Sequence, residues 1–364
     1  MSLKTVAGNH GSLHKGRGAS INPEGRFEQA LREAFDDGWE GTLEDDVRRP
    51  QTTVTAERVK SIISRNDSPD IAFAQSINPY RGCEHGCIYC YARPSHGYLN
   101  LSPGLDFETR LFAKVNAAQV LREELAKPGY ACSAITIGAN TDAYQPAERS
   151  WKITRAVLEV AAQCNQPVNI ITKNALVERD LDILAPMAEK GLASVFVSVT
   201  TLDHDLARRM EPRASAPARR IEAIRRLAQA GVPVGVMVAP IVPVLTDAET
   251  EHILEAASRA GAQSAGYVLM RLPYEVKTLF KDWLAQHYAL KAAHVMSRLK
   301  QMRDGRENDP RFGTRMRGSG EFADLLKLRF GSACKRLRLN LDRRALDTTQ
   351  FRPPRLDGQM DLFR

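Results

Sequence analysis

Residues 168–199 have the sequence VNIITKNALVERDLDILAPMAEKGLASVFVSV. Its two ends, residues 168–173 and 194–199, are short and rich in β-branched apolar residues, which is typical of strands in a parallel sheet covered on both faces. Between them, residues 181–190 have the apolar spacing of a helix and are followed by a glycine. The stretch therefore predicts two parallel strands joined by a crossover helix.

The same alternation continues along the chain in both directions. Six consecutive strand–helix units with right-handed crossovers predict an α/β fold whose sheet rolls into a barrel or partial barrel. Functional groups in such barrels lie at the carboxyl ends of the strands, where this chain has Thr141, Asp142, Thr172, Lys173 and Ser198. The further predicted strands are 71–77, 134–137, 234–238 and 264–270, and the further helices are 113–125, 153–162, 219–230 and 247–260.

The pattern divides the chain into four parts. Residues 1–65 are expected to be a loosely ordered extension, because glycines interrupt them and few apolar positions are periodic. Residues 66–272 are the predicted barrel, and residues 273–345 are expected to form a basic, mainly helical lobe. Residues 346–364 are expected to be a polar tail stiffened by two prolines. Helices within the basic lobe are expected at 283–303 and 322–329.

Three cysteines follow the first predicted strand, in the stretch RGCEHGCIYCY at residues 81–91. Cys83, Cys87 and Cys90 have the spacing C-x-x-x-C-x-x-C and supply three thiolates to one site. A [4Fe–4S] cluster normally has four cysteine ligands, so three ligands leave one iron open to bind and reduce a small molecule. The spacing favours S-adenosylmethionine, whose amino and carboxylate groups can chelate that iron.

Other uses of these cysteines fit the sequence less well. A disulfide is not expected, because the chain has only six cysteines in 364 residues and no secretory segment at its start. A structural zinc site usually has four ligands in two separated pairs, whereas His85, which could complete a set, lies between the first two cysteines. A closed ferredoxin-like cluster would need a fourth cysteine. The remaining cysteines are expected to fill the core, at Cys132, Cys164 and Cys334.

The net charge of +8 is unevenly distributed. Between Arg298 and Arg344 the chain has 14 Lys or Arg and 6 Asp or Glu, a difference of +8, so the rest sums to zero. A basic lobe on a neutral body is typical of a surface that faces nucleic acid, and we expect nucleic acid to bind at residues 298–344. The alternative is a solvated helical face with surplus arginine.

Hydropathy and cysteine usage indicate the compartment. No stretch approaches the roughly 20 apolar residues of a membrane helix, so no membrane partner is expected. Unpaired cysteines and the lack of a targeting segment predict a reducing cytoplasm.

The cysteine motif and three further segments resemble the radical S-adenosylmethionine superfamily. The further segments are NTDAYQPAE at 140–148, TK at 172–173 and EPR at 211–213. Within the superfamily they resemble the spore photoproduct lyase-like subgroup, often labelled DNA repair photolyases, over about residues 71–272. The resemblance implies a partial (β/α)6 barrel of TIM type, as the core of an enzyme that acts on nucleic acid in a repair-like or lyase-like reaction.

The resemblance also implies the cofactors and their chemistry. A reduced [4Fe–4S] cluster would pass an electron to the sulfonium of S-adenosylmethionine, and a 5′-deoxyadenosyl radical would abstract a substrate hydrogen. By match to the family, Cys83, Cys87 and Cys90 bind three irons, and an external donor supplies the electron. Tyr91 matches a tyrosine that relays the radical in the lyases, although a packed aromatic residue is the alternative.

Further residues are assigned to S-adenosylmethionine by the same match. The backbone of Tyr89 would meet the adenine, and Thr141 or Asp142 would touch the amino end. Lys173 would pair with the carboxylate through its charge. Two residues are candidates for the remaining polar contacts, Ser198 and Glu211. Asp142 could instead cap the next helix, and Glu211 could be a turn residue.

The sequence also departs from the family at two places. The photoproduct lyases have a cysteine shortly before the segment equivalent to 140–148, which returns a hydrogen atom, whereas Ala139 lies near that place here. Cys132 is at the other end of the strand, so a thymine-dimer lyase that uses this cysteine is not expected. Val244 stands where the family usually has a glycine, and this change would reshape one loop at the barrel mouth.

The last six residues, QMDLFR at 359–364, carry an independent signal. They resemble the pentapeptide that binds the bacterial sliding clamp, with Gln359 as a polar latch and Leu362 and Phe363 as apolar anchors. The preceding tether, with Pro353 and Pro354, would leave this peptide free to reach a partner. The alternative is a tail that folds back on its own domain.

Two other functions remain open from the sequence. One is a radical enzyme with the same cofactors that acts on a peptide or a small metabolite. The other is a non-enzymatic iron–sulfur protein that carries electrons or binds nucleic acid.

Overall fold

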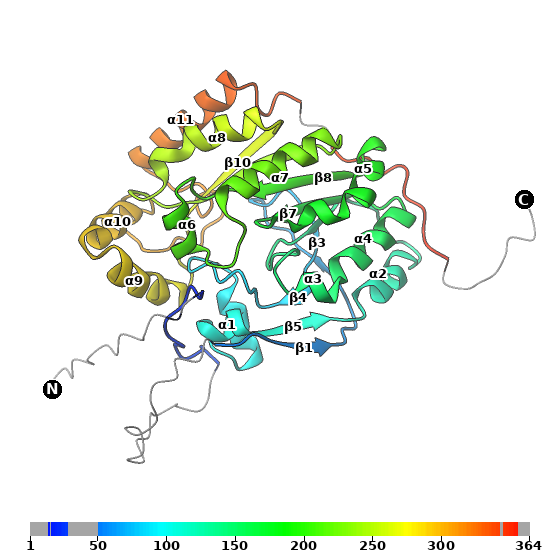
Figure 1. The fold of residues 1–364 in the computed structure, drawn as a ribbon, viewed down its shortest axis with the longest axis horizontal. Coiled ribbons are helices and arrows are strands. Elements are labelled where there is room, and N and C mark those ends of the chain that lie inside the picture. The colour runs from blue at the N-terminus through cyan, green and yellow to red at the C-terminus, as the bar shows by residue number, and fades with distance from the viewer. Residues whose placement is uncertain (1–13, 15, 28–49, 343–344, 356–364) are drawn as a thin grey trace, which may run out of the picture.

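The computed structural model describes residues 14, 16–27, 50–342 and 345–355. Its centre is a seven-stranded sheet with the strand order β10-β9-β8-β7-β6-β3-β2. Strands β3 to β10 in this order run parallel, and β2 pairs antiparallel with β3. Because β10 and β2 are the two edges, the barrel is open on one side, and the predicted partial (β/α)6 barrel is confirmed (Figure 1). The strands are β2 (Ile63–Arg65), β3 (Gln75–Ile77), β6 (Ile135–Ile137), β7 (Val168–Thr172), β8 (Ala193–Ser198), β9 (Val234–Ile241) and β10 (Ser264–Leu269).

The barrel core consists of alternate strand residues packed against the surrounding helices. Val168 and Ile170 of β7 and Val195 and Val197 of β8 are each at most 1% exposed. Burying each of these side chains contributes about 1.5–3 kcal/mol, which favours the pleat register observed. The helices wrap around the outer face of the sheet, as Figure 1 shows. They are α2 (Ala117–Leu125), α3 (Glu148–Trp151), α4 (Ile153–Gln163), α5 (Leu181–Glu189), α6 (His204–Met210), α7 (Pro217–Gln229) and α8 (Thr250–Arg259), with short helices η2 (Ala175–Asp180) and η3 (Asp247–Glu249).

A second, three-stranded sheet was not expected from the sequence. β5 (Arg110–Lys114) lies between β1 (Thr53–Glu57), its parallel partner, and β4 (Tyr80–Arg81), its antiparallel partner. The helix predicted at 113–125 therefore begins later, at Ala117, because Leu111 and Ala113 alternate with more exposed neighbours as a strand requires. Residues 50–65, expected to be loosely ordered, contain both β1 and β2.

The C-terminal helices pack directly on the barrel. The helix predicted at 283–303 is divided at Tyr288 into α9 (Val276–His287) and α10 (Ala289–Gln301), and α11 (Glu321–Arg336) is longer than predicted. Phe280 and Trp283 of α9 share an apolar cluster with Cys87 and Tyr89. The ring of Phe330 of α11 packs against that of Tyr267 of β10 in a tilted arrangement, with 4.7 Å between ring centres. Within the described ranges, no helix has the length and apolar character needed to cross a membrane.

Candidate active site

The three cysteines lie on a tight loop, residues 82–92, between β4 and η1 (Arg93–Leu99). Backbone hydrogen bonds from Gly86 N to Cys83 O (3.3 Å) and from Cys90 N to Cys87 O (3.1 Å) fold this cysteine loop into successive turns. Gly82 and Gly86 have φ values of 74° and 67°. A Cβ at Gly86 would come within 2.6 Å of Glu108 Oε2, so the loop can approach its support only with glycine there.

A buried arginine holds the cysteine loop from behind. Arg93 is 0% exposed, and its guanidinium donates to the carbonyls of Gly86 (3.1 Å) and Cys87 (2.9 Å). It also forms an ion pair with Glu108, which lies in α1 (Leu105–Thr109). Fixing two carbonyls of the loop fixes the direction in which its side chains leave.

The same carboxylate ties the N-terminal segment to the loop. Glu108 accepts hydrogen bonds from the backbone N–H groups of Gly18 and Ala19, each at 2.9 Å. Ala19 is 1% exposed and belongs to the apolar cluster that contains Cys87. Gly18 and Ala19 are therefore part of the support of the cysteine loop.

A glutamine on the opposite side completes the support. Gln145 Oε1 accepts from the N–H of Glu84 at 2.8 Å, and Gln145 Nε2 donates to the carbonyl of Gly82 at 3.2 Å. Arg213 pairs with the Glu84 carboxylate at 2.6 Å and donates its own backbone N–H to the carbonyl of His85 at 3.2 Å. Two of the segments that resemble the superfamily, 140–148 and 211–213, thus hydrogen-bond to the loop backbone.

The thiols themselves are largely shielded from solvent, with Cys83 and Cys87 buried and Cys90 half-buried. All six cysteines of the chain lie in described residues, and none forms a disulfide. Burial raises the pKa of Cys83 and of Cys87 well above the usual thiol value, and it also raises the pKa of Cys90. The Lys173 ammonium opposes this rise in pKa at Cys87 and Cys90. A metal bound at these sulfurs would favour their thiolate forms.

His85 is engaged elsewhere and is not a fourth ligand. Its Nδ1 lies 3.4 Å from Asp142 Oδ2, and its Nε2 lies 3.1 Å from Asn174 Nδ2. In the described part of the chain, no three His, Cys, Asp or Glu side chains are placed to hold one metal ion. A cluster differs from a single ion because each cysteine binds its own iron. This arrangement disfavours the zinc alternative.

Asp142 organises the ends of β6 and β7. Its carboxylate accepts from the Thr172 hydroxyl, the Lys173 N–H (both 2.7 Å) and the Tyr144 N–H (2.9 Å). Burial alone would raise its pKa, but His85 and these hydrogen bonds lower the pKa of Asp142 to about 2. The Asp142 carboxylate, which the sequence predicts to contact the amino group of S-adenosylmethionine, therefore already interacts with four neighbouring residues.

Glu211 forms a second buried network, at the ends of β8 and β9. Its carboxylate accepts from the Tyr89 hydroxyl, from Thr200 Oγ1 (2.7 Å) and from the guanidinium of Arg220. Arg220 also donates to the carbonyl of Ser198 at 3.1 Å. The predicted residues Tyr89, Ser198 and Glu211 are therefore brought together, with Arg220 as an unpredicted fourth member.

Lys173 has a different environment from these satisfied groups. Its Nζ lies 3.5 Å from the carbonyl of Ala239 and 5.9 Å from the ring centre of Tyr89. No carboxylate of the described residues forms an ion pair with it. A half-buried ammonium in this position has the charge to bind a carboxylate.

The two remaining predicted residues lie at the mouth as well. Thr141 is buried, and its hydroxyl donates to the carbonyl of Tyr80 at 3.0 Å, so it supports the strand before the cysteine loop. Tyr91 is 49% exposed, and its hydroxyl donates to the carbonyl of Ala139. Tyr91 therefore spans from the cysteine loop to the end of β6.

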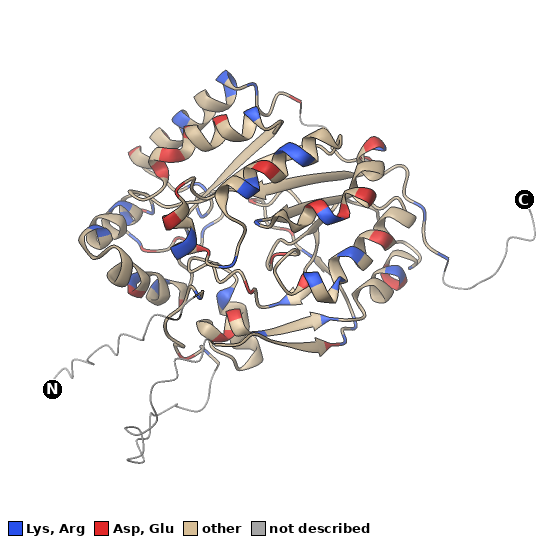
Figure 2. Cartoon of the chain, in the orientation of Figure 1, with Lys and Arg blue, Asp and Glu red and all other residues tan. Residues whose placement is uncertain are grey.

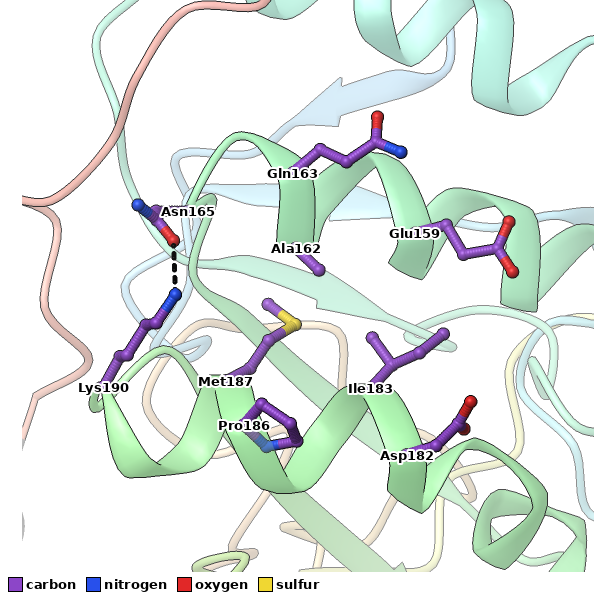
Figure 3. Close-up of a pocket in the computed structure, with 9 residues that line it drawn as sticks. All are labelled: Glu159, Ala162, Gln163, Asn165, Asp182, Ile183, Pro186, Met187 and Lys190. Atoms are coloured by element: carbon purple, nitrogen blue, oxygen red, sulfur yellow. Dashed lines mark hydrogen bonds between the residues drawn. The ribbon is translucent and has the colours of Figure 1, made fainter.

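A groove on the outer surface, between α4 and α5, is unrelated to this site. It has a volume of about 250 Å³, and Figure 3 shows its lining, with Asn165 and Lys190 joined by a hydrogen bond of 3.4 Å. Its lining contains none of the predicted site residues.

Comparisons with known proteins agree with this geometry. The model of the Radical SAM superfamily matches residues 77–257, which include the cysteine loop. An uncharacterised protein of Mycobacterium tuberculosis strain H37Rv is 36% identical over 246 residues, covering 66% of this chain and 72% of that protein. The chain belongs to the radical SAM superfamily, and it is therefore a radical SAM enzyme.

Solved structures of spore photoproduct lyase share its fold. A mutant in which serine replaces a cysteine has a TM-score of 0.56 at 15% identity, covering 78% of this chain and 79% of that chain. The lyase complexed with dinucleoside spore photoproduct has a TM-score of 0.55 at 16% identity, covering 78% of this chain and 79% of that chain. These identities relate the folds and leave the substrate of this chain to be proposed.

The cofactors follow from the superfamily and fit the residues present. They are a [4Fe–4S] cluster and S-adenosylmethionine. Three buried or half-buried thiols on one loop suit the cluster, and the ammonium of Lys173, close enough to influence Cys87 and Cys90, suits a carboxylate beside it. We expect Cys83, Cys87 and Cys90 to hold the cluster and Lys173 to orient S-adenosylmethionine.

Proposed function

We propose that this radical SAM enzyme acts on nucleic acid in a repair-like or lyase-like reaction in the cytoplasm. The main support is the position of an arginine-rich loop, residues 302–320 between α10 and α11, which we call the rim loop. Its Met316 carbonyl accepts from Leu269 N at 2.8 Å, at the carboxyl end of β10. A positively charged segment thus lies beside the strand ends that carry the cofactor residues, where a polyanion could reach them.

The rim loop also bridges the open side of the barrel. Arg315 Nε donates to Asp70 Oδ2 at 2.6 Å, and Gly313 N donates to Asp70 Oδ1 at 2.7 Å. Asp70 belongs to the connection between β2 and β3, so this contact joins the two sheet edges. Arg306 and Arg317 are exposed and have no ion pair with any described residue.

The rest of the basic lobe supports the proposal less. Arg329 pairs with Glu251 at 2.7 Å and Arg336 pairs with Glu255 at 2.8 Å, both on α8. Figure 2 accordingly shows acidic and basic residues side by side on α8 and α11. We therefore narrow the expected nucleic-acid surface from residues 298–344 to the rim loop.

The fold relationship adds support for this substrate class. Spore photoproduct lyase has been solved in complex with dinucleoside spore photoproduct, whose name places two nucleosides in the ligand. Ala139, near the place of the hydrogen-returning cysteine of the lyases, argues for a different final step. The Tyr91 hydroxyl contacts the carbonyl of this same residue.

The residues of the chain have distinct tasks in such a reaction. When bound, the cluster and S-adenosylmethionine supply reductive cleavage to a 5′-deoxyadenosyl radical. Arg93 and Gln145 hold the loop backbone so that the thiols keep their geometry, and Lys173 orients the carboxylate of S-adenosylmethionine. The apolar side chains of α9, including Phe280 and Trp283, exclude water behind Cys87.

An anaerobic assay of 5′-deoxyadenosine tests the proposal. The reconstituted enzyme, with a chemical reductant, is incubated with S-adenosylmethionine alone, with ultraviolet-irradiated DNA, and with a mixture of peptides. We expect DNA to increase 5′-deoxyadenosine formation and to acquire a modification detectable by mass spectrometry, whereas Cys87→Ala should be inactive. Stimulation by peptides alone would favour the peptide alternative. No 5′-deoxyadenosine under any condition would favour the electron-carrier alternative.

A further inference from the structure

Arg271 follows β10 at the barrel mouth and has no anionic partner among the described residues. Its Nε is buried and makes no hydrogen bond there, and its Nη1 contacts only the thioether sulfur of Met316, at 3.6 Å. A thioether is a weak acceptor, whereas a guanidinium forms its strongest bonds with carboxylates and phosphates. The Arg271 guanidinium thus offers N–H donors to this site, and no described residue forms an ion pair with it.

Two neighbouring buried or half-buried arginines, Arg303 and Arg315, differ from Arg271 in this respect. Arg303 is 0% exposed, and its guanidinium donates to the carbonyls of Leu269, Met270 and Arg315. Arg315 pairs with Asp70. Burial and the positive charge of Arg315 lower the pKa of Arg271, and the weaker opposing effects of Tyr91 and Asp70, which is itself paired with Arg315, do not offset them. Of the guanidiniums of Arg271, Arg303 and Arg315, that of Arg271 is the one without a carbonyl or carboxylate partner among the described residues.

The position of Arg271 relates it to the reaction site. Its guanidinium carbon lies 5.8 Å from the ring centre of Tyr91, the residue that follows Cys90. Because Tyr91 reaches across to Ala139, an anion bound by Arg271 would lie beside the path between the cysteine loop and the end of β6. Arg303 fixes the backbone on the amino side of Arg271 and at Arg315, so the location of the guanidinium is well defined.

The geometry points to a phosphodiester-binding site at Arg271, in which its guanidinium binds a backbone phosphate of the substrate and positions it beside Tyr91. This inference rests on the proposed function and names the contact that holds the substrate. A carboxylate would satisfy the guanidinium equally well. The exposed Tyr91 ring favours a nucleotide, because it offers an aromatic face on which a base next to the bound phosphate can stack.

The test uses the full-length reconstituted protein and a fluorescent single-stranded oligothymidylate under anaerobic conditions. Arg271→Gln keeps a planar polar group and loses the charge. We expect its affinity to fall about tenfold. Its salt dependence should also flatten, with a slope of log K on log salt smaller by about 0.7, as for one lost phosphate contact. Arg271→Lys should lie between the wild type and Arg271→Gln.

Arg259→Gln is the matched control. Arg259 is the exposed last residue of α8, at the end where the chain enters β10, which is opposite to the mouth. It makes the same change in net charge and should leave the affinity and the slope unchanged. Thermal unfolding checks a purely structural role, because Arg271→Gln relieves repulsion from Arg315 and should not lower the melting temperature.

The outcomes separate the inference from the proposed function. If the wild type binds DNA and Arg271→Gln binds equally well, the inference is wrong and the proposed function stands. Weaker binding together with a lowered melting temperature would assign Arg271 to the fold and overturn the inference. Failure of the wild type to bind DNA would contradict both. Tighter binding of polyglutamate than of DNA, lost in Arg271→Gln, would replace the phosphodiester by a peptide carboxylate.

Discussion

The guanidinium of Arg93 forms a fully buried ion pair with the carboxylate of Glu108, directly behind the cysteine loop. Neither charge contacts solvent, and each also hydrogen-bonds to backbone groups of other segments. The pair therefore connects three separate parts of the chain at the back of the site. Its loss should affect both stability and cluster binding.

Arg93→Met removes one charge and leaves Glu108 buried without its partner. We expect the free energy of unfolding to fall by about 3–5 kcal/mol, measured by urea denaturation of the protein without its cluster. Iron content after reconstitution should fall as well, because the loop carbonyls lose their donor. The control is Arg81→Gln, which breaks the more exposed pair with Glu57 and should cost at most about 1 kcal/mol. Equal effects of the two substitutions would contradict the role given to Arg93.

Replacing any one of Cys83, Cys87 and Cys90 by alanine should abolish stable cluster assembly. Each removes a ligand of a different iron, so we expect loss of the visible absorption of the cluster and of most of its iron. Cys164→Ala is the control, because Cys164 is 2% exposed in the barrel core. It should lower stability by about 1 kcal/mol and retain the iron. Cluster assembly in Cys87→Ala at the wild-type level would refute the ligand assignment.

Lys173→Met should weaken S-adenosylmethionine binding while the cluster stays intact. The substitution keeps much of the aliphatic stem and removes the ammonium that we expect to pair with the carboxylate. The dissociation constant should rise by about tenfold or more, as measured by anaerobic equilibrium dialysis. Lys190→Met is the control, since Lys190 contacts Asn165 on the outer surface. An unchanged dissociation constant for Lys173→Met would exclude the pairing.

Because of Lys114, the free energy of unfolding should depend on pH in the alkaline range. Burial, with repulsion from Arg81, lowers the pKa of Lys114 from 10.5 to about 8. Because the folded state binds this proton more weakly than the unfolded state, the charged form destabilises the fold below about pH 8. That penalty disappears as pH rises towards 10.5, by up to about 3 kcal/mol.

Comparison with Lys114→Met isolates this effect from other titrating groups. At pH 7 the variant should be more stable than the wild type in urea unfolding, and the difference should vanish by about pH 10.5. Lys127→Met, at an exposed position, should show no such pH-dependent difference. A constant difference between pH 7 and 10.5 would mean that Lys114 is not destabilised by its charge.

The clamp-binding prediction concerns Gln359, Leu362 and Phe363, which lie outside the described residues. We propose that they bind a bacterial sliding clamp, with the two apolar side chains as anchors. Deleting 359–363 should abolish co-purification with a purified clamp, and replacing Leu362 and Phe363 by alanine should do the same. Replacing Asp361 by alanine should have a smaller effect. Undiminished co-purification after the deletion would exclude this partner.

Local patterns in the sequence were enough to predict the barrel. In β7, Val168 and Ile170 are spaced so that both face the core, and the helices that follow have matching apolar spacing. The cysteine triad was recognisable from its spacing alone. Each of these two signals is contained in a short stretch of sequence, where periodicity and spacing are informative.

Contacts between distant segments could not be predicted in this way. The pairing of β5 with β1 depends on the register between the two strands and on the burial of their side chains in the folded chain. Neither strand has a distinctive sequence pattern by itself. Arg315 of the basic lobe pairs with Asp70, 245 residues away in the sequence, so a count of charges overestimates the free positive charge. The sequence predicts that Asp142 contacts S-adenosylmethionine. The hydrogen bonds of its carboxylate to the end of β7 and its contact with His85 depend on the tertiary fold and could not be predicted from the sequence.

The hydrogen bonds from Gly18 and Ala19 to Glu108 set a limit on how far this enzyme can be shortened. The superfamily match begins at residue 77, but the residues that pack behind the cysteine loop begin with Gly18, some sixty residues earlier. A protein shortened to the matched residues 77–257 would lose Gly18 and Ala19, and the cluster that we expect on this loop would then be more accessible to oxygen. The smallest piece suitable for crystallisation or for transplanting the site into another scaffold is therefore longer than the segment that matches the superfamily.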